Sequence, residues 1–351
     1  MPDAISIGSR LVGPGEPTYI IAELSANHGG VLENAVQLVE AAAAAGANAI
    51  KLQTYTADTI TIDHAEGTFL IGSNSPWAGR TLYDLYREAS TPWEWHRPLR
   101  DLAHRLGLDF FSSPFDVSAV DFLQRLDVPA YKIASPEIVD IGLIKAAAAT
   151  GRPLIMSTGM ASVVEIEAAV ETARANGIGG VALLRCNSTY PAPIEEMDLR
   201  TIPDMIARFD TVVGLSDHTI GGMAAPIAVA LGASIVEKHL TMSRAHAGPD
   251  SGFSSEPDEF AAMVHAIREA ETALGAVRYG PSSSELGTVP FRRSLYVVAD
   301  IAEGDVLTET NVRSIRPGDG LPPRHLDDVL GRRTGRALQK GTPLRWEDVR
   351  D

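Results

Sequence analysis

Two histidines in the second half of the chain are the residues best suited to chemistry. His218 follows an apolar run at residues 211–215, and His239 follows another at 233–236. Two imidazoles at the same ends of neighbouring strands can bind one divalent metal and leave coordination positions open for a substrate. The two residues are 21 positions apart, so only the fold can bring them together. The alternative is two buried structural histidines, because histidine is often partly buried in ordinary proteins.

Two lysines stand inside apolar segments that have the composition of strands. Lys51 lies in AIKLQT, on the same strand face as Gln53, and Lys132 lies in YKIAS. A buried lysine is costly unless it is paired, and for either lysine alone an ion pair with Glu23 or Glu137 is the simpler explanation. Two such lysines together with serines at strand ends instead indicate a pocket for a small anion, such as a phosphate or a carboxylate. The serines and other polar residues at or near the expected strand ends are Ser113, Ser135, Ser157, Ser188, Tyr190 and Ser216.

Strand-like and helix-like segments alternate from residue 19 to about residue 275, and they must position these side chains. The predicted strands are residues 19–24, 49–54, 108–112, 130–134, 153–157, 181–185, 211–215 and 234–239. Predicted helices between them include residues 33–45, 94–106, 117–126, 163–176 and 258–274. Eight such units in about 260 residues predict an α/β fold of the (β/α)8 TIM-barrel type, whose sites lie at the C-terminal strand ends. An open doubly wound sheet is the alternative, which the lack of a glycine-rich dinucleotide motif disfavours.

One connection is longer than a plain strand-to-helix loop. Residues 55–93 follow the second predicted strand and contain TLYDLYREASTPWEWH. Long insertions at this end of a barrel commonly carry substrate loops.

Bulk composition restricts the possible partners. The 351 residues are 45% hydrophobic and 21% charged, and the formal net charge is −15. An excess of negative charge argues against nucleic acid or an anionic membrane surface as a general partner. The chain has one cysteine, Cys186, and shows neither a signal pattern nor an apolar run long enough for a membrane span. We therefore expect a cytoplasmic protein.

The composition changes near residue 276. We expect a barrel domain at residues 1–276, a linker rich in Gly, Ser and Pro at 277–290, and a compact small domain at 291–351. About 60 residues fold alone only marginally, so the small domain is expected to dock on a barrel, its own or a partner's. Arg316 lies in SIRPGDG, an exposed turn, where the local sequence favours a solvated surface arginine.

Ordered motifs along the chain resemble those of the sialic acid synthases, barrel enzymes with a C-terminal antifreeze-like (SAF) domain. The matching segments are IIAELSANHGG, IKLQTYTADTIT, FFSSPF, YKIAS, STGM, NSTYP, GLSDHT, EKH and GPD, and they span essentially the whole chain. SANHGG, CNSTYP, RRSLY and SIRPGDGL are most similar to the branch of the family that acts on 2,4-diacetamido-2,4,6-trideoxy-altrose. The neuraminate branch typically has Asn in the segment where this chain has Ser188.

The resemblance implies a transferase that condenses phosphoenolpyruvate with an open-chain amino sugar aldehyde and releases phosphate. It implies that His218 and His239 hold a divalent metal, usually Mn²⁺, although Mg²⁺ and Co²⁺ also fit such ligands. Glu23 is then the acid/base near the attacking water. The residues implied to bind phosphoenolpyruvate are Lys51, Ser113, Lys132, Ser135, Ser157, Ser188 and Ser216. Those implied to contact the sugar are Gln53, Glu137, Tyr190, Asp250 and Arg316.

The same resemblance implies a homodimer in which Arg316 reaches the sugar in the barrel of a second chain. This reverses the local interpretation of Arg316. Three alternatives remain at this point: an N-acetylneuraminate or legionaminate synthase, a metal-dependent barrel aldolase or isomerase, and a non-enzymatic binding protein.

Overall fold

The computed structural model describes residues 2–73, 75–246 and 248–351. Asn74, in the insertion that follows the second predicted strand, and Ala247 therefore lie outside the described residues. The chain divides into two compact units, Met1–Gly275 and Ala276–Asp351. Each unit has its own buried apolar core.

The first unit is a closed barrel of eight parallel strands, which confirms the predicted TIM-barrel class and excludes the open sheet. The strands pair in the order β10-β3-β4-β5-β6-β7-β8-β9, so the last strand closes against the first. Their bounds are β3 Tyr19–Glu23, β4 Ala49–Thr54, β5 Asp109–Pro114, β6 Tyr131–Ile133, β7 Leu154–Ser157, β8 Val181–Cys186, β9 Val212–Asp217 and β10 Ile235–His239.

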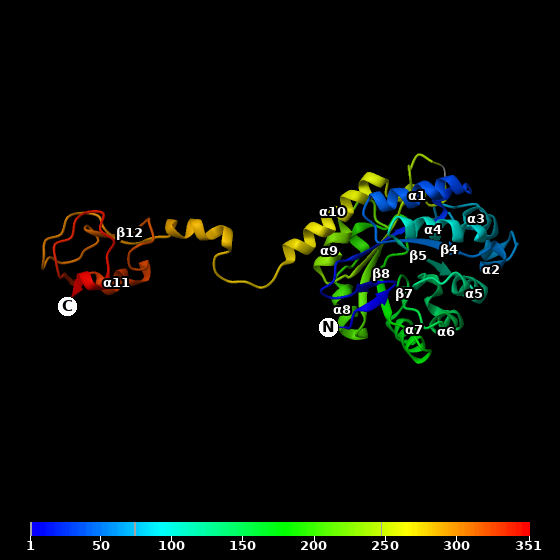
Figure 1. Ribbon diagram of the computed structural model, residues 1–351, viewed down its shortest axis with the longest axis horizontal. Coiled ribbons are helices and arrows are strands. Elements are labelled where there is room, and N and C mark those ends of the chain that lie inside the picture. The colour runs from blue at the N-terminus through cyan, green and yellow to red at the C-terminus, as the bar shows by residue number, and fades with distance from the viewer. Residues whose placement is uncertain (1, 74, 247) are drawn as a thin grey trace. The chain divides into compact units, whose positions relative to one another are not determined.

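Helices surround the barrel strands (Figure 1). They bury alanine and leucine faces against the sheet, while the strands are buried on both sides, as a parallel sheet covered by helices requires. The helices are α1 Leu32–Ala44, α4 His96–Arg105, α5 Val117–Arg125, α6 Ile141–Ala148, α7 Val163–Ala175, α8 Thr201–Phe209, α9 Ala224–Ala230 and α10 Pro257–Leu274. An antiparallel hairpin, β1 Ile5–Ile7 and β2 Arg10–Val12, precedes the first barrel strand.

Side-chain caps fix where several helices begin, and the strand ends with them. Asp116 accepts the backbone N–H groups of Ser118 and Ala119 at the start of α5. Ser162 and Glu165 form a reciprocal capping box at the start of α7. Each cap therefore ends a loop that leaves the C-terminal end of a strand, where the predicted site residues stand.

The long insertion is folded. It contains two short helices, α2 Ala57–Ile60 and α3 Leu82–Ala89, which contact each other. Between them, Leu70 and Thr81 form an antiparallel bridge, and Ile71 N–H donates to the Arg80 carbonyl at 2.9 Å. Thr81 caps α3 by accepting the Asp84 N–H at 3.0 Å.

The second unit is built from short strands around a small core that includes Leu295, Leu307 and Leu344. Its elements are β11 Ser294–Val297, β12 Val312–Ile315, α11 Leu326–Val329, β13 Arg333–Thr334 and β14 Val349–Arg350. The segment expected as a linker overlaps a 3-10 helix, Ser283–Phe291.

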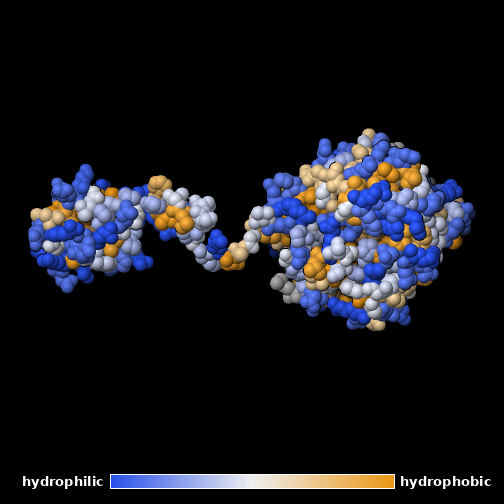
Figure 2. Space-filling view, viewed as in Figure 1, coloured by the Kyte–Doolittle hydropathy of each residue, from blue (hydrophilic) through white to orange (hydrophobic). Residues whose placement is uncertain are grey.

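The space-filling view shows hydrophobic side chains on the surface of the segment that precedes the small domain (Figure 2). Val277 is 92% exposed, and Tyr279 is 95% exposed. Within the described ranges, no helix has both the length and the apolar character needed to cross a membrane.

Candidate active site

A cavity of about 530 Å³ opens at the C-terminal ends of the barrel strands. Most of the site residues predicted from the sequence line this cavity, and they come from strands and loops all around the barrel. The predicted site residues that line it are Glu23, Lys51, Gln53, Lys132, Ser135, Glu137, Ser157, Tyr190, Ser216, His218, His239 and Asp250. Three others do not line it: Ser113, Ser188 and Arg316.

Two of these three lie directly behind the lining. Ser113 Oγ accepts a hydrogen bond from Lys51 Nζ at 3.3 Å. Ser188 Oγ lies 3.6 Å from the sulfur of Cys186, which does line the cavity. In each case one other side chain, Lys51 or Cys186, stands between the serine and the cavity.

Two lysines and two glutamates form a buried ion-pair network at the base of the cavity. Lys51 Nζ lies 2.9 Å from Glu23 Oε2 and 3.6 Å from Glu237 Oε1, and Lys132 Nζ lies 3.7 Å from the same Glu237 oxygen. The second carboxylate oxygen of Glu237 is buried without a hydrogen-bond partner. The lysines are thus paired, as a buried cation must be, yet one of their partners is incompletely satisfied.

Burial and pairing shift the pKa values in this network in opposite directions. Burial raises the pKa of Glu23, and Lys51 only partly offsets it. Burial would also raise the pKa of Glu237, but Lys132 and Lys51 outweigh it and lower that pKa. Burial lowers the pKa of Lys132, whereas for Lys51 the two glutamates outweigh burial and raise it. Of the two glutamates in the network, Glu23 is therefore the one better placed to hold and release a proton, and Glu237 is the one held as an anion.

Glu237 was not among the predicted site residues. The available signal was its spacing, because Glu237 stands two residues before His239 and so shares its strand face. Hydroxyl groups complete the network: Ser157 Oγ accepts from Lys132 Nζ at 2.7 Å, and Ser216 Oγ donates to Glu237 Oε1 at 3.3 Å.

Gln53 connects Glu23 to a second group of polar residues. Gln53 Nε2 donates to Glu23 Oε1 at 2.9 Å and to Ser25 Oγ at 3.0 Å, and the Ser25 hydroxyl donates to Asp250. Ser25 has a φ of 46°, in the left-handed region that non-glycine residues seldom occupy. The predicted sugar-contacting residues Gln53 and Asp250 are thereby joined to the predicted acid/base. Ser25, which lines the same cavity, was not predicted.

His218 and His239 stand together at the ends of β9 and β10, with ring centroids 5.3 Å apart. His218 Nδ1 lies 2.8 Å from the backbone carbonyl of Asn187. A carbonyl can only accept, so this nitrogen carries the proton and leaves Nε2 with a free lone pair. His239 Nδ1 is buried with no hydrogen-bond partner, and burial lowers the pKa of His239 far below its usual value.

These observations fit a metal with two protein ligands. A neutral imidazole is the form that binds a metal, and the lowered pKa of His239 favours that form. Burial would also lower the pKa of His218, but Cys186 and the Asn187 carbonyl outweigh it and raise that pKa, so a metal would have to displace a proton from this ring. The described part of the chain contains no cluster of three or more His, Cys, Asp or Glu residues arranged to hold an ion, so further coordination positions would fall to substrate or water. Aromatic rings enclose the pair: the Tyr190 ring lies 4.4 Å from that of His218, and the Phe253 ring lies 5.2 Å from that of His239.

The long insertion supplies one side of the cavity. Trp77 Nε1 donates to the Pro249 carbonyl at 2.7 Å, and its ring lies 5.8 Å from that of Tyr190. These contacts tie the insertion to the loops that follow β8 and β10. Residues of the insertion thus line the cavity, and the expectation that residues 55–93 carry a substrate loop stays a prediction.

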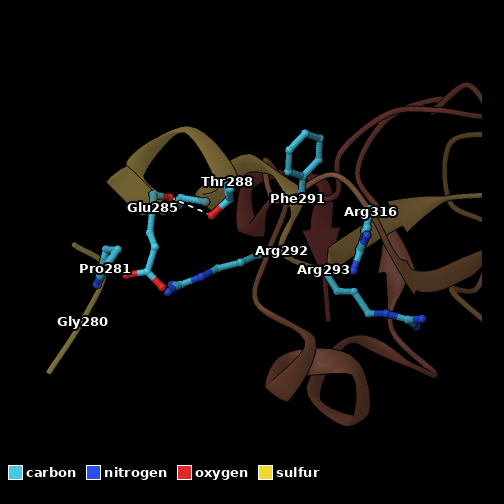
Figure 3. Close-up of a pocket in the computed structure, with 9 residues that line it drawn as sticks. Gly280, Pro281, Glu285, Thr288, Phe291, Arg292, Arg293 and Arg316 are labelled. Atoms are coloured by element: carbon cyan, nitrogen blue, oxygen red, sulfur yellow. Dashed lines mark hydrogen bonds between the residues drawn. The ribbon is translucent and has the colours of Figure 1, made fainter. Parts of the chain in front are cut away.

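Arg316 belongs to the second unit. There it lines a cavity of about 600 Å³ together with Arg292 and Arg293. Figure 3 shows Glu285 extending toward the end of Arg292, on the side of this cavity away from Arg316. Arg316 makes no ion pair with any residue that the structure describes. Its predicted role at a barrel of a second chain stays a prediction.

Comparisons with known proteins agree with this geometry. Residues 38–279 match the model of the NeuB family, and residues 292–350 match that of the SAF domain. The chain is 42% identical over 332 residues to the pseudaminic acid synthase of Campylobacter jejuni, covering 95% of this chain and 96% of that protein. It is 36% identical over 347 residues to the N,N'-diacetyllegionaminic acid synthase of Legionella pneumophila, covering 97% of both.

A crystal structure of N-acetylneuraminic acid synthetase from Leptospira borgpetersenii, in complex with citrate, superposes with a TM-score of 0.74 at 33% identity. The match covers 82% of this chain and 96% of the other. The expected barrel, the SAF domain and the enzyme class, a phosphoenolpyruvate-dependent transferase that forms a carbon–carbon bond, are confirmed. The chain belongs to the NeuB family and carries a C-terminal SAF domain.

Proposed function

We propose that this chain is a pseudaminic acid synthase, which condenses phosphoenolpyruvate with 2,4-diacetamido-2,4,6-trideoxy-altrose and releases phosphate. The observation that carries the proposal is the arrangement of Lys51 and Lys132 in one cavity with the two histidines. A site for a small anion would then adjoin a site for a metal. The likeness to the Campylobacter synthase, 42% against 36% for the legionaminic acid enzyme, favours the altro sugar.

Phosphoenolpyruvate would bind at the lysine–glutamate network. Its phosphate and carboxylate would pair with the ammonium groups of Lys51 and Lys132 and accept hydrogen bonds from the cavity-lining hydroxyl groups of Ser135, Ser157 and Ser216. Ser113 and Ser188, behind the lining, would support the site through Lys51 and Cys186. A fixed set of donors in a buried site stabilises developing negative charge without the reorganisation that water needs.

His218 and His239 would hold a divalent metal, Mn²⁺ or alternatively Mg²⁺ or Co²⁺, and this ion would supply Lewis-acid polarisation of the sugar aldehyde. Gln53, Glu137, Tyr190 and Asp250 line the cavity beside it and would orient the sugar. In the reaction, carbon three of phosphoenolpyruvate forms a bond to the aldehyde carbon. Water then adds at carbon two, and the carbon–oxygen bond to phosphate breaks.

Glu23 would take the proton from the attacking water. Its pKa is raised by burial, and its carboxylate is held by Lys51 and Gln53 on either side. A raised pKa makes a carboxylate a stronger base, as proton abstraction from water requires. Because this water attacks carbon two, phosphate leaves by cleavage of a carbon–oxygen bond.

We also propose that the working form is a cytoplasmic homodimer in which Arg316 contacts the sugar in the barrel of the second chain. Two features of the second unit support it. Arg316 has no acidic partner among the described residues, and it lines a cavity of the second unit together with Arg292 and Arg293. A cluster of arginines suits recognition of a polar partner or ligand.

The reaction in ¹⁸O-labelled water with phosphoenolpyruvate, Mn²⁺ and the altro sugar tests this proposal. We expect a nine-carbon acid by mass spectrometry and phosphate free of label, because water attacks carbon and not phosphorus. Labelled phosphate would mean simple phosphate-ester hydrolysis, and absence of the nine-carbon acid would contradict the proposed condensation. An N-acetylneuraminate or legionaminate synthase would give the acid with a different sugar.

A further inference from the structure

Helix α3 turns one apolar face toward the active-site cavity. Leu82, Leu85, Tyr86 and Ala89 all line the cavity, and their spacing of i, i+3, i+4 and i+7 places them on one side of the helix. The charged residues of α3 lie on the other side, where Arg87 is paired with Asp84 at 2.7 Å. An amphipathic helix normally buries its apolar face against a protein core. In α3 this face lines the cavity.

Neighbouring elements extend this face into an apolar wall. Ile60 at the end of α2, Ile71 and Phe115 line the same part of the cavity. The Tyr55 ring contacts both sides of the wall, with its centroid 5.0 Å from that of Phe115 and 5.8 Å from that of Tyr86. We call the cavity-lining residues of α3 with Ile60, Ile71 and Phe115 the apolar wall.

The closed barrel places the Phe115 end of this wall across the cavity from His218. In the circle of eight strands, β5 is four positions from β9, so Phe115, just after β5, stands opposite His218, just after β9. Helix α3 lies in the insertion between β4 and β5. A ligand whose reacting carbon is held at the histidines therefore extends its far end toward the wall.

We propose that the apolar wall, through the Leu82, Leu85 and Ala89 side of α3, receives a methyl-terminated end of the sugar and selects a 6-deoxy substrate over its 6-hydroxy counterpart. The inference rests on the proposed function and adds to it the residues that read one end of the sugar. A hydroxyl group placed against these side chains would lose water without gaining a hydrogen-bond partner, whereas a methyl group gains apolar contact.

The expected selectivity is moderate. An apolar pocket discriminates against an added hydroxyl by roughly 100-fold at most. We therefore expect wild-type kcat/KM to favour 2,4-diacetamido-2,4,6-trideoxy-altrose over the same sugar with a 6-hydroxyl by about 10- to 100-fold. We expect most of the difference in KM, because the wall is remote from the reacting carbon.

The test measures phosphate release by the full-length enzyme with phosphoenolpyruvate, Mn²⁺ and each of the two sugars. Leu82→Asn places an amide in the wall and should reduce the selectivity ratio by roughly 10-fold. Ala89→Ser makes a smaller change on the same helix face and serves if the first variant fails to fold. Ile62→Asn is the matched control, because Ile62 belongs to the same insertion, is 59% exposed and does not line the cavity.

A reduced ratio in the wall variants with an unchanged ratio in Ile62→Asn supports the inference. Equal use of both sugars by the wild type would overturn it, as would an unchanged ratio in folded Leu82→Asn and Ala89→Ser. The proposed function is judged separately by the wild type: phosphate release with neither sugar would reject that function and the inference together, whereas release with both at equal efficiency rejects the inference alone.

Discussion

Lys132 and Glu237 are paired inside the barrel, with Nζ of the lysine 3.7 Å from Oε1 of the glutamate, and the same oxygen lies 3.6 Å from Lys51. Glu237 is thus shared by the two ammonium groups that the proposed reaction assigns to phosphoenolpyruvate, and Glu23 is the second and nearer partner of Lys51. Substrate binding would replace part of this internal pairing. If the proposed function holds, Glu237 would therefore compete with phosphoenolpyruvate for these two lysines.

This competition predicts the behaviour of Glu237→Gln. Removing one partner of a buried pair is costly, so we expect a loss of about 3 kcal/mol in the free energy of unfolding without ligand. Phosphoenolpyruvate should restore more stability to this variant than to the wild type, because its anionic groups replace the lost carboxylate. Thermal unfolding with and without phosphoenolpyruvate measures both effects, with Glu171→Gln on the surface of α7 as control. Equal ligand-induced stabilisation in both proteins would argue against the assigned anion site.

Removal of one imidazole should remove the metal. We expect His218→Ala to weaken Mn²⁺ binding by at least about 100-fold and to reduce phosphate release to background. Calorimetric titration with Mn²⁺ reads the binding without reference to activity. His265→Ala is the matched control, since His265 is an exposed histidine on α10. Full activity of His218→Ala in the presence of chelator would exclude the assigned metal role.

The environment of Glu137 predicts that the free energy of unfolding depends on pH. Burial raises its pKa to about 7, and its Oε2 has no hydrogen-bond partner. The folded state therefore favours the protonated acid, and the stability this contributes is present below about pH 4.5 and is lost as the pH rises through about 7. Glu137→Gln mimics the protonated acid and should raise the free energy of unfolding at pH 8 by on the order of 2 kcal/mol, with little effect at pH 4.

Denaturant unfolding of Glu137→Gln at the two pH values measures this difference. Glu167→Gln, an exposed change on α7, is the control. A gain in stability at pH 4 that equals the gain at pH 8 would show that the effect does not come from ionisation of Glu137.

Replacement of Arg316 is expected to weaken the use of the sugar and leave phosphoenolpyruvate binding unchanged. If it reaches the sugar of a second chain, Arg316→Ala should raise the KM for the sugar by roughly 10- to 100-fold, the cost of a hydrogen bond to a charged group. Binding of phosphoenolpyruvate should be unchanged, as separate titrations can show. Arg324→Ala tests for a general effect of lost charge, because Arg324 is exposed in the same unit. Equal weakening of both substrates would rule out a role confined to the sugar.

The barrel was predictable because its strands are short, apolar and separated by regular helical segments. Strand β4 has the predicted bounds, and β10 differs from the prediction by one residue. The polar residues at the strand ends could also be identified from the sequence, and the closed barrel brings most of them into one cavity. Residues on separate strands meet there because all parallel strands end on the same side.

The remaining features depend on tertiary contacts that local sequence does not encode. The spacing of Glu237 from His239 placed both residues on one strand face, but only the fold showed that both lysines lie beside Glu237. The face of α3 that lines the cavity looks, by its periodicity, like any helix face that packs on a core. Ser113 and Ser188 were predicted to bind substrate but lie behind the cavity lining. Their positions at strand ends could not show whether they line the cavity or lie behind it.

The most direct test of the proposed function is phosphate release with phosphoenolpyruvate and Mn²⁺, run in parallel with three sugars. These are the altro diacetamido sugar, its manno isomer of the legionaminate type, and N-acetylmannosamine. We predict release with the altro sugar at one phosphate per phosphoenolpyruvate consumed, and much slower release with the other two. Preferential release with another sugar would contradict the assigned specificity, and no release from folded, metal-loaded protein with any of the three would contradict the proposed function.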